Sequence, residues 1–211
     1  MAEKPNRDWT GNSQSSYAMI GASNHALEDR EQDDYYSTDP DAIEVLFKHV
    51  SFSDKIWECA CGNGALSKRM EKLGKQVKST DLVDRGYGVG GVNFLSQTEP
   101  FDGDIITNPP YKYVTEFVLK AIELTQDKVA MFLKLTTLEG RERYEKIFKP
   151  YPPKDVYVFI NRMMCFKSDA ETAKSSAVCF AWFIWQKGYN GLPTIHWIST
   201  KEIETNQIKL F

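Results

Sequence analysis

The sequence lacks a long hydrophobic run. No apolar stretch in its 211 residues reaches the roughly 18 residues that a membrane-spanning helix needs. Residues 1–5 also lack the apolar core of a signal peptide. We therefore expect a protein that does not enter a membrane and that works in the cytoplasm.

Residues that bind metals are few and scattered. Of the four cysteines, Cys59 and Cys61 stand too close together for the usual zinc-binding pair, and the three histidines are far apart. We expect no metal site. Free thiols are typical of an intracellular protein.

The chain has no excess of positive charge. Its net charge of −3 argues against a general polyelectrolyte binder of nucleic acid, which usually has a basic face. A local basic cleft is still compatible with the sequence, because several lysines and arginines lie between residues 134 and 149. Lys134 and Arg141 are the candidates for substrate contact, and a solvated helix face is the alternative.

The composition is that of a soluble globular protein. Hydrophobic residues make up 42% of the chain, which is enough for a full core. Residues 1–34 are polar and show little periodicity, so they predict an extended or partly disordered arm. Residues 35–211 predict one domain, with no gap long enough for a separate target-recognition domain.

Strand-like and helical segments alternate along this domain. Helices are predicted after Pro40 and at residues 65–73, 115–124 and 139–148. The seven predicted strands cover residues 55–58, 76–80, 104–107, 129–135, 155–160, 176–185 and 194–198. Such alternation predicts an α/β fold with a mostly parallel sheet and helices on both faces. Ligands in such folds bind at the carboxyl ends of the strands.

A glycine-rich segment, Glu58–Gly64, joins the first predicted strand to a helix. Gly62 and Gly64 allow a tight turn in which a ligand can lie against bare backbone. The Glu58 carboxylate can accept a hydrogen bond from a ligand ammonium. Asp81, at the end of the next strand, can accept both hydroxyls of a ribose. An ordinary turn is the alternative interpretation of each feature.

The tetrapeptide Asn108–Tyr111 follows the predicted strand 104–107. The Asn108 side-chain oxygen and the Pro109 carbonyl form a pair of acceptors. An exocyclic amine that donates to both has its lone pair localised and directed toward a methyl donor. Pro109 and Pro110 restrict the backbone, so the acceptors need little reorganisation. The pattern predicts methyl transfer to a planar nitrogen; a simple loop turn is the alternative.

In this order and spacing, the motifs resemble those of the amino methyltransferases that use S-adenosylmethionine. The resemblance is closest to phage-type N6-adenine DNA methyltransferases with the Asn-Pro-Pro-Tyr motif, and it covers about residues 35–187. It implies a single-domain Rossmann-like methyltransferase fold, S-adenosylmethionine as cofactor and DNA as partner. It also implies DNA methylation in the cytoplasm of a bacterial host cell.

The resemblance assigns roles to individual positions. The residues that would bind the methyl donor are Thr38, Pro40, Glu58, Cys59, Ala60, Gly62, Gly64, Asp81, Leu82, Asn93, Phe94 and Asn108. The catalytic residues would be Asn108, Pro109, Pro110 and Tyr111. The substrate-binding residues would be Tyr111, Phe166, Lys134 and Arg141.

Two positions depart from the family's pattern. Asn93 stands where an aspartate often contacts the adenine of the donor, and Cys59 stands where a small residue or a proline is more usual. The Asn93 carbonyl can still accept a hydrogen bond.

Two aromatic rings would suit a flipped base. Extrusion of a base costs a few kcal/mol, and stacking on a ring returns roughly 1–3 kcal/mol. Tyr111 is the first candidate ring. The resemblance points to Phe166, before the last long strand, as the second; a buried core phenylalanine is the alternative.

Other substrates share this chemistry. Enzymes with the same tetrapeptide methylate the glutamine amide of proteins or guanine amines in ribosomal RNA. The segment Tyr35–Pro40 and Phe166 favour adenine in DNA. Without a separate recognition domain, sequence recognition would fall to residues 134–153, residues 161–176 or the N-terminal arm. A catalytically degenerate binding module is the non-enzymatic alternative.

Overall fold

The computed structural model describes residues 37–161, 163, 165–166 and 178–201. The chain divides into two units, residues 1–32 and 33–211, and every described residue belongs to the second. The predicted polar arm at residues 1–34 therefore lies outside the described residues. No helix in the described part of the chain is long and apolar enough to cross a membrane.

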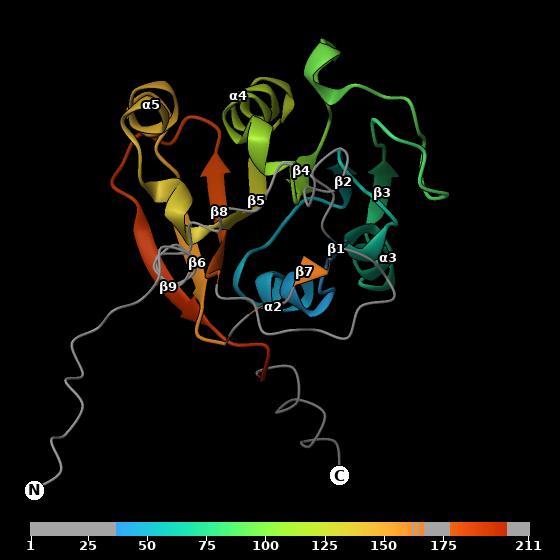
Figure 1. The fold of residues 1–211 in the computed structure, drawn as a ribbon, viewed down its shortest axis with the longest axis horizontal. Coiled ribbons are helices and arrows are strands. Elements are labelled where there is room, and N and C mark those ends of the chain that lie inside the picture. Colours follow the sequence, from blue (N-terminus) through green and yellow to red (C-terminus); the bar gives the residue numbers. More distant parts are fainter. Residues whose placement is uncertain (1–36, 162, 164, 167–177, 202–211) are drawn as a thin grey trace, which may run out of the picture. The chain divides into compact units, whose positions relative to one another are not determined.

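A seven-stranded sheet forms the centre of the unit 33–211 (Figure 1), with the strand order β3-β2-β4-β5-β8-β6-β9. The strands are β2 (Lys55–Glu58), β3 (Gln76–Ser79), β4 (Asp104–Thr107), β5 (Lys128–Lys134), β6 (Asp155–Phe159), β8 (Phe180–Gln186) and β9 (Thr194–Ile198). All pairings are parallel except those of β8, which runs antiparallel to both β5 and β6. The predicted mostly parallel α/β sheet is confirmed.

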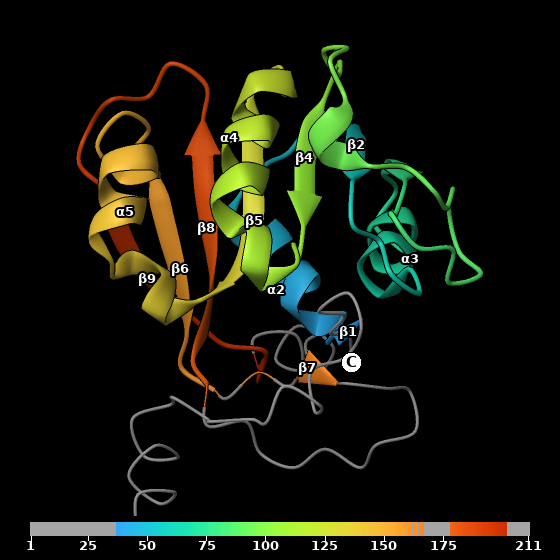
Figure 2. The same cartoon turned by 45° about the horizontal axis from the view of Figure 1, so that its top comes forward.

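Helices cover both faces of the sheet, as Figures 1 and 2 show. The helices are α2 (Asp41–His49), α3 (Ala65–Lys72), α4 (Val114–Leu124) and α5 (Arg141–Arg143). Neighbouring residues of one strand alternate between the faces: Ile56 packs with α2 and α3, whereas Trp57 packs with α4. This period of two, on strands apolar on both sides, is the signature of a sheet buried between two layers.

The segment after β5 is less regular than its sequence predicts. We expect one helix over residues 139–148, but α5 spans only Arg141–Arg143 and continues as a π-helical turn, Tyr144–Phe148. Short 3-10 helices occur at Phe94–Ser96, Tyr111–Tyr113 and Leu135–Leu138. Each of these follows, directly or after a loop, the carboxyl end of a strand.

A two-stranded ladder lies apart from the main sheet. β1 (Ser37–Thr38) pairs antiparallel with β7 (Cys165–Phe166), and the partners are Ser37 with Phe166 and Thr38 with Cys165. The sequence predicts a helix start at residues 37–40, and the helix itself begins at Asp41, where the Asp39 carboxylate accepts a hydrogen bond from the Asp41 N–H at 3.0 Å. The ladder brings together two segments that are distant in the sequence.

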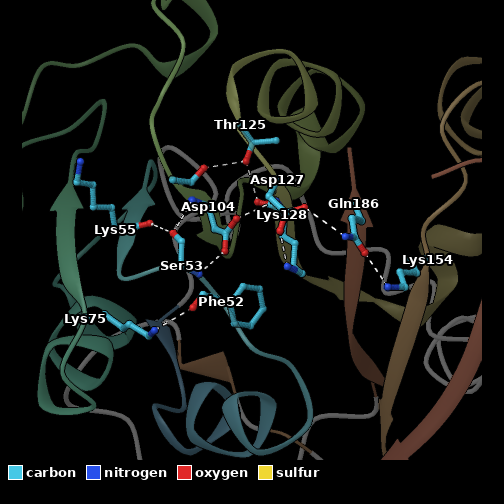
Figure 3. Close-up of polar contacts among 11 residues, drawn as sticks. Phe52, Ser53, Lys55, Lys75, Asp104, Thr125, Asp127, Lys128, Lys154 and Gln186 are labelled. Carbon is cyan, nitrogen blue, oxygen red and sulfur yellow. Dashed lines mark hydrogen bonds and ion pairs between the residues drawn. The ribbon is translucent and has the colours of Figure 1, made fainter. Parts of the chain in front are cut away.

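A buried carboxylate joins the starts of three central strands (Figure 3). Asp104, the first residue of β4, accepts hydrogen bonds from the backbone N–H groups of Ser53, at 2.7 Å, and Lys128, at 2.8 Å. Its own N–H donates to the Ser53 hydroxyl at 3.2 Å. Burial raises the pKa of Asp104, and the two backbone donors oppose that rise. The carboxylate fixes where β2, β4 and β5 begin relative to one another.

We predict that Asp104→Ala lowers the free energy of unfolding by about 2–4 kcal/mol, because two N–H groups lose their acceptor inside the protein. Urea denaturation followed by circular dichroism measures the change. Asp102→Ala is the matched control: this neighbouring carboxylate is exposed and pairs with Lys55 at the surface, so the midpoint should not move. Equal losses in both variants would contradict the role given to Asp104.

Candidate active site

The predicted motifs meet at one edge of the sheet. β2 and β4 pair in parallel with Trp57 opposite Ile105, and β2 and β3 pair with Glu58 opposite Ser79. Adjacent strands lie about 4.8 Å apart. The loops that follow β3, β2 and β4 therefore leave the sheet side by side. These loops carry Asp81, residues 59–64 and the tetrapeptide, and Glu58 is the last residue of β2.

The segment after β2 forms a tight turn. Gly62 and Gly64 have φ angles of 56° and 80°, in the left-handed region that favours glycine. The turn is closed by the Gly64 N–H, which donates to the Cys61 carbonyl at 2.8 Å. The Cys61 N–H donates to the Thr80 carbonyl at 3.0 Å and ties the turn to the end of β3.

Asp81 is held in place by backbone groups. One carboxylate oxygen accepts a hydrogen bond from the Gly62 N–H at 2.8 Å, and the other accepts one from the Val83 N–H at 2.9 Å. Each oxygen can accept a further bond, because a carboxylate offers about four lone-pair positions. The next residue, Leu82, is 60% exposed and presents an apolar surface beside the carboxylate.

Glu58 is a buried carboxylic acid at the end of β2, with an exposed fraction of 2%. The Ser67 hydroxyl donates to it, and the Ser67 and Ser79 hydroxyls are 2.7 Å apart. Burial raises the pKa of Glu58 to about 8, and the charge of Asp81 adds to the rise. A cationic group bound next to Glu58 would favour the carboxylate form.

Cys59 and Cys61 are both buried. Burial raises the pKa of the Cys59 thiol well above its ordinary range and that of Cys61 to about 12, so both remain thiols at neutral pH. Cys59 belongs to the apolar core on the α4 face. The donor-binding role predicted for it would rest on its backbone. Ala60, the next residue, is half-buried.

The tetrapeptide directly follows β4. The Asn108 amide donates to the Thr38 hydroxyl at 2.8 Å, and Thr38 is itself buried. This bond ties β1 to the tetrapeptide and orients the amide. Pro109 is buried, and Pro110 leads into the 3-10 helix Tyr111–Tyr113. The structure thus brings Thr38 and Asn108 together, whereas Pro40 stands at the start of α2.

Tyr111 is half-buried, and its hydroxyl is covered by the protein. Its ring lies 6.2 Å from the ring of the core residue Phe180. The ammonium of Lys134, the last residue of β5, lies over the Tyr111 ring at 4.5 Å from its centroid. The structure thus places Lys134 at the tetrapeptide. Arg141 is exposed at the start of α5.

Two predicted donor-binding residues have structural tasks. The Asn93 side chain is exposed and accepts a hydrogen bond from the Leu95 N–H at 3.0 Å, which caps the 3-10 helix Phe94–Ser96. The Phe94 ring is buried between Trp57, at 5.2 Å, and Phe117, at 5.1 Å. Phe94 can therefore offer a ligand its backbone and not its ring.

The backbone of Phe166 pairs with Ser37, next to the residue that contacts Asn108. β7 therefore runs beside the segment that contacts the tetrapeptide. The position of the Phe166 ring lies outside what the structure describes.

Sequence reasoning did not identify Ser67 or Tyr87. The Tyr87 ring covers Gly64 so closely that an added Cβ would lie 2.2 Å from it. The Tyr87 hydroxyl donates to Glu71 at 3.1 Å, and the segment is fixed to β3 because the Val89 N–H donates to the Ser79 carbonyl at 3.0 Å. The available signal was an aromatic residue within the glycine-rich stretch 86–91.

A hollow of about 690 Å³ lies beside β3 and adjoins the glycine-rich turn, because Thr80 and Tyr87 line it. Its lining includes Glu71, Lys78, Tyr87 and Val89 but not Glu58, Asp81 or Asn108. Among the described residues there is no group of three or more His, Cys, Asp or Glu side chains that could hold a metal ion.

The sequence matches no protein-family model and no curated protein. Solved structures do share the fold. A candidate RNA methyltransferase, PH1948 from Pyrococcus horikoshii, has a TM-score of 0.56 and 16% identity, with 84% of this chain and 99% of that chain covered. A predicted O-methyltransferase, Atu636 from Agrobacterium tumefaciens, has a TM-score of 0.54 and 12% identity. The match covers 75% of this chain and 85% of that chain.

A third similar structure is the modification subunit of a candidate type I restriction enzyme from Vibrio vulnificus. Its TM-score is 0.50 and its identity 11%, with 87% of this chain and 50% of that chain covered. The chain has a Rossmann-like methyltransferase fold. The carboxyl edge that carries Asp81, Glu58 and Asn108 is the edge at which ligands bind in open α/β sheets.

We predict that Glu58→Gln changes how stability depends on pH. With its pKa raised from 4.5 to about 8, Glu58 makes the folded state bind more protons than the unfolded chain between these values. Its contribution is fully present below about pH 4.5 and is lost as the pH rises through 8. The variant should therefore gain stability relative to the wild type from pH 5 to pH 8 in ligand-free urea denaturation.

The exposed residue Glu99 offers the control, since Glu99→Gln should run parallel to the wild type. A Glu58→Gln curve that also runs parallel would show that Glu58 is ionised in the free protein.

Proposed function

We propose that the protein is an S-adenosylmethionine-dependent methyltransferase that modifies an exocyclic amine, with N6 of adenine in DNA as the substrate. The observation that supports this most strongly is the position of Asn108. Its amide lies at the end of β4, oriented by Thr38, on the strand next to the glycine-rich turn. A pair of acceptors of this kind, beside a glycine-rich turn, suits methyl transfer to a planar nitrogen.

The residues present fit the proposed donor. Asp81 retains acceptor capacity for both ribose hydroxyls while the Gly62 and Val83 N–H groups hold it. Glu58 would accept from the ammonium of the methionine part. Leu82 offers an exposed apolar side chain, and Asn93 and the Phe94 backbone would meet the adenine. When bound, S-adenosylmethionine supplies an electrophilic methyl group.

The tetrapeptide would prepare the nucleophile. The exocyclic amine of adenine is a weak nucleophile because its lone pair is delocalised into the ring. The Asn108 oxygen and the Pro109 carbonyl would accept its two hydrogens and direct the lone pair. Reacting atoms must approach to about 3–3.5 Å for efficient transfer. The amine becomes acidic only as the new bond forms, so its proton can pass to water without a strong base.

Several features favour a nucleic acid. Tyr111 offers a ring for stacking, and Lys134 places a positive charge beside it. Two of the similar structures are described as an RNA methyltransferase candidate and a restriction-modification subunit. DNA in the cytoplasm of a bacterial cell is the substrate we propose. RNA, a protein glutamine amide or a purely binding role are the other outcomes that the assay separates.

We predict that the protein methylates adenine in DNA. Purified protein with radiolabelled S-adenosylmethionine should label adenine-containing DNA, and hydrolysis should recover the label as N6-methyladenine. RNA and glutamine-containing peptides are offered in parallel. Label found in another base or in glutamine would replace DNA adenine as the substrate. A protein that does not bind S-adenosylmethionine in calorimetry would contradict the enzyme itself.

Two substitutions separate the transfer chemistry from donor binding. Asn108→Ala should lower the rate of transfer roughly 100- to 1,000-fold, the usual effect of losing one stabilising polar group, and should leave donor affinity nearly unchanged. Asp81→Ala should weaken donor binding roughly tenfold or more, because a charged acceptor is lost. Isothermal titration and single-turnover transfer measure the two quantities.

The neighbouring Asp84, which is exposed, provides the control for Asp81. Asp84→Ala should bind the donor like the wild type. Unchanged affinity in Asp81→Ala would remove Asp81 from the donor site, and a wild-type rate in Asn108→Ala would remove the catalytic role of the tetrapeptide.

A further inference from the structure

Lys134 reaches the tetrapeptide because β5 is longer than its neighbour. The last pairing of β4 with β5 joins Thr107 to Met131, and β5 continues to Lys134. Three further residues of strand carry the chain about 10 Å onward. The ammonium of Lys134 then lies over the Tyr111 ring, 4.5 Å from the centroid.

The ammonium occupies the place that a stacked base would need. Rings that stack in proteins have their centroids about 4.5–7 Å apart. Tyr111 is half-buried and packed against core residues, among them Phe180, and Lys134 lies over its ring. A base and the ammonium cannot share this position. Entry of a base must therefore displace Lys134.

Among the described residues, Lys134 also lacks a carboxylate partner, and it is half-buried, whereas Arg141, which has none either, is exposed to solvent. The neighbouring basic residues are engaged locally: Lys146 pairs with Glu142 and Lys149 with Glu145. Arg143 donates to the backbone carbonyls of residues 136, 137 and 139. A displaced Lys134 would need an anion.

We propose that Lys134 rests on Tyr111 in the free protein and moves to a phosphate of the nucleic acid when the target base stacks on that ring. This rests on the proposed function and names the group of the substrate that Lys134 recognises. Lys134 is thus a specificity-determining residue.

Displacement of Lys134 from the Tyr111 ring favours nucleotides as substrates. A base that displaces the ammonium replaces one ring contact with another, and the attached phosphate supplies the new partner through a charge-assisted hydrogen bond. A glutamine side chain would displace the same ammonium and bring no anion. Lys134 therefore favours a phosphate-bearing substrate over a neutral one with an equivalent nitrogen.

A double-mutant cycle tests the contact. The substrates are a single-stranded 12-nucleotide DNA with one adenine and the same strand with neutral methylphosphonate linkages on both sides of that adenine. For the wild type, the neutral linkages should lower kcat/KM about tenfold, which corresponds to the loss of one charge-assisted bond. For Lys134→Met, the two substrates should differ less than twofold.

Two further variants complete the test. Lys146→Met, which removes a lysine already paired with Glu142, should keep the wild-type tenfold preference. Lys134→Arg should restore it, and Lys134→Gln replaces Lys134→Met if the latter does not fold. A Lys134→Met protein that keeps the tenfold preference would overturn the proposal, and so would a wild type with no preference. Methylation of glutamine peptides and not of DNA would instead overturn the proposed function.

Discussion

The buried carboxylate of Asp104 sets the geometry on which the rest of the site depends. It stands at the start of β4 and accepts backbone hydrogen bonds from Ser53, ahead of β2, and from Lys128, at the start of β5. Strands that begin in a fixed register also end in a fixed register. The chain rises about 3.3 Å per strand residue. The start of each strand therefore determines where Glu58, Asn108 and Lys134 lie along the strand direction at the carboxyl edge.

Two ionisable groups at this edge, Glu58 and Lys134, lack partners of opposite charge within the described ranges of the chain, and a ligand can supply them. Glu58 is buried, and this burial disfavours its charged form and raises its pKa. Lys134 has an aromatic ring as its contact and no counter-ion among the described residues. In the part of the chain that the structure describes, the site around Glu58 lacks a cation and the site around Lys134 lacks an anion. A donor with an ammonium group and a substrate with a phosphate would complete both, and a buried carboxyl with a raised pKa, such as Glu58, is typical of functional sites.

Local patterns predicted the central sheet well. The strands 55–58, 104–107 and 194–198 were predicted with the bounds that β2, β4 and β9 have, because short apolar runs between turn residues have few other solutions. The β1–β7 ladder was not predicted, since its two-residue strands pair across the length of the domain and leave no periodic signal. The π-helical turn after Arg143 was also missed, because its apolar spacing resembles that of an ordinary helix.

The candidate site was predictable in part, because its residues lie at the ends of strands that the sequence predicts. Glu58 ends its strand, Asp81 and Asn108 follow theirs, and parallel strands bring their carboxyl ends together. The positions of Phe94, inside an aromatic cluster, and of Tyr87, over Gly64, depend on tertiary packing that one sequence does not reveal. The contact of Lys134 with Tyr111 depends on the extra length of β5 relative to β4, which becomes visible only when the register is known.

We propose that this edge of the sheet holds a methyl donor against Asn108. A crystal structure of the protein with S-adenosylmethionine tests it most directly. We predict that the Asp81 carboxylate bonds the ribose hydroxyls, that the ammonium lies at Glu58 and that the methyl group faces the Asn108 side chain. A donor bound in the hollow beside β3, or bound with its methyl group directed away from the tetrapeptide, would contradict the account.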